Sequence, residues 1–135
     1  TMRTRLTVFV TGILVILLAA GAFAAEPGVQ RSSTGGVTVD VTPQTLAASA
    51  KSWDFKVVLD THAGDLNDDL VKTATLLDGK GGRYIPVQWE GAGPGGHHRE
   101  GVLNFKPVSP MPATIELQIK RVGEANPRSF RWQLK

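Results

Sequence analysis

Two polar stretches of the chain hold all three of its histidines. They are THAGDLNDD at residues 61–69 and GGHHREG at residues 95–101. Neutral imidazole is the commonest protein ligand for zinc and copper, and carboxylates complete such sites. If the two stretches meet in the fold, they could hold one Zn(II) or Cu(II) ion. The candidate metal ligands are His62, Asp65, His97 and His98, with Asp60 as a further carboxylate.

Three other interpretations of these residues stay open. The acids of residues 61–69 suit calcium, although they lack the D-x-D-x-D-G spacing of an EF-hand. The cluster could instead be a loop clasp, in which Arg99 forms a bidentate pair with Asp65 or Asp69 and locks the two stretches together. The candidate clasp residues are then Asp60, Asp69 and Arg99.

Catalysis is the weakest interpretation, because no serine or cysteine nucleophile accompanies the histidines. Ser32 and Ser33 lie far upstream, Ser109 follows a later strand, and cysteine is absent from the chain. The absence of cysteine also excludes disulfides and thiolate metal sites. We therefore expect a protein that is not an enzyme and whose domain is held together by its core alone.

The elements that position these stretches are predicted to be strands. After residue 36 the apolar residues recur with period two, as in Ile115, Leu117 and Ile119, which is typical of strands with one buried face. The expected strands are residues 37–42, 52–60, 70–77, 83–90, 101–106, 113–121 and 128–134. Seven short strands predict an all-β, immunoglobulin-like antiparallel β-sandwich, with a small closed barrel as the alternative.

Strand parity predicts where the polar stretches lie. If each strand reverses the direction of the one before it, the connections after the second, fourth and sixth strands share one end of the sandwich. These connections are THAGDLNDD, GAGPGGHHRE and GEANP. All three histidines and several acids are therefore expected to gather at one end.

The N-terminal residues predict export. Arg3 and Arg5 precede an uncharged apolar run at residues 8–25, which is the layout of a signal peptide. The run is also close to the roughly 20 residues that span a bilayer, so a retained anchor stays open. Both alternatives place the rest of the chain outside the cytoplasm, on the periplasmic or extracellular face, anchored in the inner membrane if the segment is uncleaved. The expected division is a signal peptide or transmembrane anchor helix at 1–25, a flexible linker at 26–36 and the sandwich at 37–135.

Charge adds one exclusion. The chain has 15 Lys and Arg against 12 Asp and Glu, and two of those arginines lie in the leader, so the exported part carries 13 against 12. No Lys/Arg cluster with interleaved aromatics is present, and a nucleic-acid partner is not expected. The membrane is an expected partner only through an uncleaved N-terminal segment, and no protein partner is indicated.

The two polar stretches also resemble a known group of domains. LDTHAGDLNDDL and WEGAGPGGHHREGVLNF are similar to a family of small exported or membrane-anchored prokaryotic β-sandwich domains with D-T-H-x-x-D-L-x-x-D-L and G-G-H-H-R-x-G-V-L motifs. The resemblance covers roughly residues 37–134. It implies a fold and a location, and it carries over no catalytic or ligand residue.

These observations favour a non-catalytic extracytoplasmic binding module that takes a divalent transition metal, Cu or Zn, at its two-loop His/Asp cluster. The alternative is a structural or assembly domain of a membrane-associated complex, in which the His/Asp/Arg cluster is a loop clasp.

Overall fold

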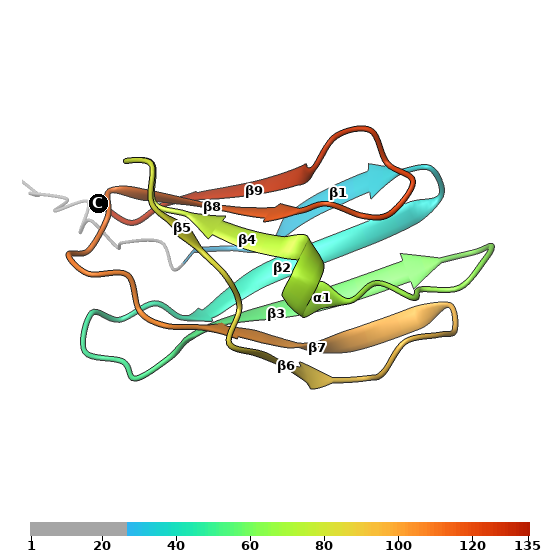
Figure 1. Cartoon of the computed structure of the whole chain (residues 1–135), viewed down its shortest axis with the longest axis horizontal. Coiled ribbons are helices and arrows are strands. Elements are labelled where there is room, and N and C mark those ends of the chain that lie inside the picture. The colour runs from blue at the N-terminus through green and yellow to red at the C-terminus, as the bar shows by residue number, and fades with distance from the viewer. Residues whose placement is uncertain (1–26) are drawn as a thin grey trace, which may run out of the picture.

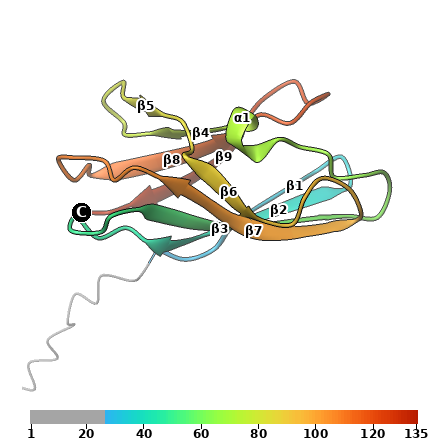
Figure 2. The ribbon, with the colours of Figure 1, turned by 60° about the horizontal axis from the view of Figure 1, so that its bottom comes forward.

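The computed structural model describes residues 27–135, which form two antiparallel sheets packed face to face (Figures 1 and 2). The first sheet has the order β1-β2-β3-β7-β6 and the second β5-β4-β8-β9. The strands of the first are β1 (Gln30–Thr34), β2 (Val37–Thr45), β3 (Trp53–Thr61), β6 (Gln88–Gly91) and β7 (His98–Phe105). Those of the second are β4 (Ala74–Leu77), β5 (Arg83–Tyr84), β8 (Thr114–Ile119) and β9 (Arg128–Gln133).

The prediction of an all-β antiparallel sandwich is confirmed, with nine strands in the described residues where seven were expected. The predicted signal or anchor helix at residues 1–25 lies outside the described residues. Within residues 27–135 no helix is long and apolar enough to cross a membrane.

The N-terminal strand β1 is the first difference. We expected a flexible linker at residues 26–36, but Gln30–Thr34 pairs with β2 in a hairpin that turns at Gly35 and Gly36. Both glycines have positive φ, 59° and 76°, which other residues rarely adopt. The strand is an edge strand with mostly exposed side chains, so it needs no apolar alternation and gives no period-two signal.

The segment predicted as one strand at residues 83–90 is divided between the two sheets. Pro86, which has no amide hydrogen to donate to a ladder, lies between β5 and β6. The chain crosses from one sheet to the other there, and Ile85 and Val87 are 73% and 58% exposed. The alternation of Ile85 and Val87 with polar residues predicted a strand with one buried face, but both side chains face solvent.

A short helical turn replaces the start of another predicted strand. Residues 70–77 were expected to be extended throughout, but α1 (Leu70–Thr73) precedes β4. The Asp69 carboxylate caps this turn by accepting a hydrogen bond from the Lys72 amide at 3.3 Å. Strand β7 also begins three residues earlier than predicted, which places His98 and Arg99 on a strand instead of in a loop.

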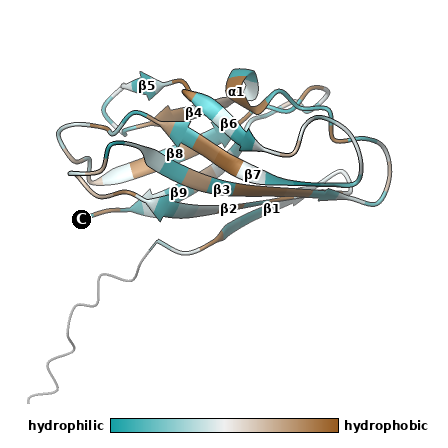
Figure 3. Cartoon of the chain, turned by 90° about the horizontal axis from the view of Figure 1, so that it is seen from below, coloured by the Kyte–Doolittle hydropathy of each residue, from teal (hydrophilic) through white to brown (hydrophobic). Residues whose placement is uncertain are grey.

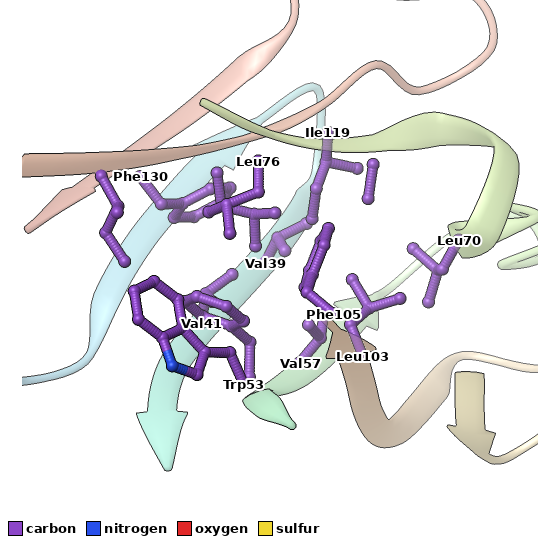
Figure 4. Close-up of a cluster of buried hydrophobic side chains, with 14 of the residues drawn as sticks. Val39, Val41, Trp53, Val57, Leu70, Leu76, Leu103, Phe105, Ile119 and Phe130 are labelled. Atoms are coloured by element: carbon purple, nitrogen blue, oxygen red, sulfur yellow. The ribbon is translucent and has the colours of Figure 1, made fainter. Parts of the chain in front are cut away.

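The core fills the space between the sheets (Figure 4). Trp53, Phe55, Phe105 and Phe130 are its largest fully buried side chains, and Phe55 meets Phe105 edge-on at 5.6 Å between ring centroids. Buried and less buried residues alternate along β3, as the sequence pattern predicts. Figure 3 shows both hydrophobic and hydrophilic stretches along β7, whose sequence alternates less regularly. The buried apolar side chains of the described part lie between Val39 and Trp132.

The sandwich has two ends with different connections. At the first, the histidine end, lie the β1–β2 turn and the connections 62–69, 92–97 and 120–127 (Figure 1, right). At the other, the terminal end, lie the connections 46–52, 78–82 and 106–113 and the last residues. The chain also enters there, because the Trp132 indole donates to the Gly28 carbonyl at 2.8 Å.

The close pairing of β6 and β7 predicts a sharp steric limit at Gly101. A Cβ at this residue would lie 2.5 Å from the Trp89 ring and 2.8 Å from the Glu90 carbonyl oxygen. We expect Gly101→Ala to lower the free energy of unfolding by about 1–3 kcal/mol, measured by urea denaturation. Gly93→Ala is the matched control, because nothing lies within 4 Å of a Cβ there. Equal stability of the two variants would contradict this packing.

Candidate functional site

The histidine end brings the two polar stretches together, as strand parity predicts. The Thr61 amide donates to the His97 carbonyl at 2.9 Å, and the Leu66 amide donates to the Gly96 carbonyl at 3.0 Å. The Gly95 amide returns a bond to the Leu66 carbonyl at 2.9 Å. The connections 62–69 and 92–97 therefore run side by side, joined through their backbones.

Arg99 joins the same two connections through its side chain. Arg99 faces the core side of β7, as Gly101, Leu103 and Phe105 do, and is 2% exposed. Its guanidinium donates to the Asp68 carbonyl at 2.6 Å, the Leu66 carbonyl at 3.3 Å and the Ala92 carbonyl at 3.1 Å. It also lies 5.6 Å from the centroid of the Trp89 ring, within cation–π range. A buried charge at the end of the core is thus satisfied by backbone oxygens of two loops.

Asp68 extends this polar chain to the second sheet. Its carboxylate accepts two hydrogen bonds from Arg121, at 2.7 and 3.0 Å, and only 6% of its side chain is exposed. Arg121 in turn approaches Glu124 at 3.4 Å. Because bidentate arginine–carboxylate pairs are directional as well as strong, this pair fixes the connection 62–69 against the β8–β9 connection.

Arg128 completes the chain on the far side of Glu124. It donates to both Glu124 carboxylate oxygens, at 2.9 and 2.7 Å, and these bonds hold the pKa of Glu124 below its ordinary value. The same guanidinium donates to the carbonyls of Ser32, Val37 and Thr34 at 2.9, 2.8 and 3.0 Å. The β1–β2 hairpin is therefore tied to the start of β9.

Together these contacts form one arginine chain across the histidine end. Its members are Arg99, Asp68, Arg121, Glu124 and Arg128. All four connections at this end are held by it. The sequence placed Asp68 and Glu124 in connections at this end, but it assigned only Arg99 among these residues to a clasp. The signal for a second member was present, because Arg128 stands in phase with the inward residues Phe130 and Trp132, where an apolar side chain is expected.

His98 belongs to a separate cluster on the outer face of β3 and β7. Its Nδ1 lies 2.5 Å from the Asp60 carboxylate and its Nε2 lies 3.5 Å from Glu100. Glu100 also pairs with Lys56 at 2.8 Å. The hydrogen bond to Asp60, and more weakly Glu100, raises the pKa of His98 above its ordinary value. The cluster is exposed, with 58% of the His98 side chain accessible, so it sits apart from the buried arginine chain.

Arg99 bonds to both connections, but not through the partners that the clasp hypothesis named. Arg99 does not pair with Asp65 or Asp69; it bonds backbone carbonyls, because its inward direction carries it away from the exposed carboxylates. Asp69 caps α1 instead, and Asp60 holds His98. His62, Asp65 and His97 are exposed, and none makes a side-chain hydrogen bond or ion pair within residues 27–135.

The predicted metal ligands are not gathered at one point. In the described residues no group of three or more His, Cys, Asp or Glu side chains has a geometry that could hold a metal ion. His98 pairs with the carboxylates of Asp60 and Glu100 on the outer face of β7. The backbone carbonyl of His97 accepts a hydrogen bond from the Thr61 amide. The Cu or Zn site stays a hypothesis of the sequence pattern.

Comparison of the chain with protein-family models, with curated proteins and with solved structures returned no significant match.

The arginine chain predicts a large loss of stability when Arg128 is removed. Arg128→Ala leaves three carbonyls and the Glu124 carboxylate without their shared donor. We expect the free energy of unfolding to fall by about 3 kcal/mol in urea denaturation. Arg131→Ala is the matched control, since Arg131 is 76% exposed and pairs only with Glu116; it should cost at most about 1 kcal/mol. Similar losses in both variants would contradict a structural role for the chain.

The outer-face cluster predicts a specific histidine titration. Asp60→Asn removes the main interaction that favours protonated His98, so the pKa of His98 should fall toward its ordinary value of 6.5. Asp65→Asn, which alters a carboxylate with no bond to His98, should leave it unchanged. Titration of the imidazole proton resonances by NMR measures both.

The same shift has a defined effect on stability. The pKa of His98 is higher in the folded state than in the unfolded state. Its contribution to the free energy of unfolding is therefore full below pH 6.5 and is lost as the pH rises through the folded-state pKa. Thermal unfolding of the wild-type protein should show this loss, and Asp60→Asn should make it smaller, because only the weaker interaction with Glu100 then remains. A pH dependence that is unchanged in Asp60→Asn would show that His98 is not its source.

Proposed function

We propose that residues 27–135 form an immunoglobulin-like, non-catalytic extracytoplasmic module that acts as a structural or assembly domain of a membrane-associated complex. The observation that carries the proposal is the arginine chain of Arg99, Arg121 and Arg128. It commits the buried polar groups of the histidine end to holding loops. These groups are therefore not available as a nucleophile, base or ligand set.

Sheet topology supports the immunoglobulin-like assignment. In that fold one sheet has the strand order A-B-E-D and the other contains C-F-G. The order β2-β3-β7-β6 corresponds to the first, and β4-β8-β9 corresponds to the second, with β5 added beside β4. Strand β1 is an addition before the first strand of the pattern. In this scheme the connections at the histidine end are those after the second, fourth and sixth core strands.

The rigidity of the histidine end supports an assembly role. Binding partners lose less entropy when the loops that meet are already ordered. The backbone bonds between the connections 62–69 and 92–97 and the Asp68–Arg121 pair provide such order. His62, Asp65 and His97 are then exposed on fixed loops, where they are accessible to a partner.

Export is supported by the leader alone. The basic residues Arg3 and Arg5 and the apolar run at 8–25 favour passage of the domain across the membrane, and the run is long enough to remain as an anchor. An anchored chain would keep the module beside membrane proteins, which suits assembly better than free diffusion.

The clasp and metal hypotheses differ in what stabilises the protein. Under the proposal, Arg99→Ala leaves the Leu66 and Asp68 carbonyls unpaired and should lower Tm by about 10 °C. Arg83→Ala, an equal change of charge at an exposed residue, should leave Tm unchanged. EDTA should have no effect on the wild-type Tm in the same calorimetric or circular-dichroism melt.

The opposite pattern would favour the metal site. A Tm that falls with EDTA, recovers with Zn(II) or Cu(II) and no longer responds in His62→Ala would show that His62, His97 or His98 and Asp65 hold a metal. In that case the proposed structural role of the cluster would be wrong.

A further inference from the structure

Basic side chains in this domain are paired unevenly. Residues 27–135 contain 13 of the 15 Lys and Arg, the other two being Arg3 and Arg5. Eight of the 13 bond a carboxylate or a backbone carbonyl: Arg31, Lys56, Lys72, Arg99, Lys120, Arg121, Arg128 and Arg131. Within the described residues the remaining five make no ion pair and no side-chain hydrogen bond. They are Lys51, Lys80, Arg83, Lys106 and Lys135.

All five of these cations are exposed and lie at the terminal end. Two lie in the connections 46–52 and 78–82, and a third, Arg83, pairs across from Leu77 beside the second of these. The last two follow the ends of β7 and β9. Figure 1 shows these segments together at the end where the C-terminus is marked.

The acids at the terminal end do not neutralise these cations. Asp54 accepts hydrogen bonds from Ser52 and Asn104, at 2.7 and 2.6 Å. Asp78 caps its own hairpin by accepting from the backbone amides of Lys80 and Gly82, at 2.8 and 2.9 Å. Neither carboxylate pairs with one of the five cations, and two carboxylates against five cations leave an excess of positive charge at this end.

Exposed apolar side chains also occur at or beside the terminal end. Four large ones occur in the described part, and three of them, Val29, Ile85 and Val87, are at or beside the terminal end, from 58% to 73% exposed. The fourth, Val122, is at the histidine end. The Val87 amide is held by the Asn104 carbonyl, which keeps the Ile85–Val87 crossover in place at this end of β7. Cations mixed with exposed aliphatic side chains suit the boundary between lipid headgroups and acyl chains.

The N-terminal segment joins the domain at this end. Because Gly28 is fixed to Trp132, only Glu26 and Pro27 separate it from the end of the apolar run at Ala25. The three Cα–Cα steps from Ala25 to Gly28 span at most about 10 Å, so a bilayer that holds the run would lie close to the terminal end.

We propose that the terminal end docks on an anionic bilayer surface, with the five unpaired cations facing lipid phosphates. A hollow of about 530 Å³ opens there, lined by residues of the 78–82 hairpin, β8 and β9. Arg83 and Leu77 are among its lining residues, beside the Glu116–Arg131 ion pair. The histidine end then points away from the membrane. This inference rests on the proposed function only in that the proposed anchor brings the terminal end close to the bilayer.

The test uses the full chain, which has no cysteine, so single cysteines can be introduced for labelling. Ala48→Cys, at the terminal end, and Ala125→Cys, at the histidine end, are both at exposed residues. Each carries a fluorophore, and the vesicles carry a lipid quencher at headgroup depth. We expect quenching at residue 48 in phosphatidylcholine–phosphatidylglycerol vesicles, loss of it in phosphatidylcholine alone or at high salt, and none at residue 125.

Charge variants test the side chains that are responsible. Each Lys near an anionic surface contributes about fivefold in binding, so Lys80→Gln with Lys106→Gln should lower the ratio of docked to free domain about 25-fold. Lys72→Gln with Lys120→Gln is the matched control, because it removes the same charge at the histidine end. Quenching that ignores lipid charge, equal quenching at residues 48 and 125, or an equal effect of both pairs of substitutions would overturn the proposal.

Vesicle flotation separates this inference from the anchor. Flotation with neutral vesicles and no quenching at residue 48 in anionic ones would leave the anchor standing and reject the docking surface. Flotation with anionic vesicles only, with residue 48 quenched, would reject the anchor and support the docking surface.

Discussion

The cost of burying a guanidinium organises one end of this sandwich. Arg99 and Arg128 both stand in the inward phase of their strands, where the core would otherwise continue, and both are at most 5% exposed. A buried charge is tolerated only when its donors are satisfied. Each arginine finds acceptors in the backbone carbonyls of connections from other parts of the chain, so the loops must take the positions that supply them. The order of the histidine end follows from this requirement.

The added strand β1 decides at which end of the sandwich the chain enters. A chain that began directly at β2 would enter at the histidine end, because β2 runs from that end to the other. The β1–β2 hairpin reverses the entry, so Gly28 meets Trp132 at the terminal end. Arg128 holds that hairpin through Ser32, Thr34 and Val37 carbonyls. One arginine therefore links the arrangement of the loops to the direction from which the chain arrives.

The two ends consequently differ in how their charges are used. At the histidine end Asp68 and Glu124 are balanced by Arg121 and Arg128, and the bonds from Arg128 lower the pKa of Glu124. At the terminal end cations such as Lys80 and Lys106 have no such partner within the described residues. Paired charges stabilise loops, whereas unpaired charges remain available for a surface of opposite sign. The net charge of the domain does not show that paired charges gather at one end and unpaired cations at the other.

The sequence by itself determined the elements whose signal is local. Alternation in Trp53–Leu59, Ile115–Ile119 and Phe130–Trp132 is a local property, and it predicts the core strands, the antiparallel sandwich and the meeting of the two histidine stretches. It failed where a strand is an exposed edge, as in β1, and where Pro86 diverts an alternating segment, so that Ile85 and Val87 face solvent.

Only the tertiary structure decided which polar groups are partners. The Asp68–Arg121 pair joins residues 53 positions apart, and the Arg128–Ser32 contact joins residues 96 apart. A side chain's direction can be read from its phase, but the acceptor that it meets depends on which loop the folded sheets bring to it. For that reason Arg99 could be expected to act as a clasp, whereas its carbonyl partners could not be named before the fold was known.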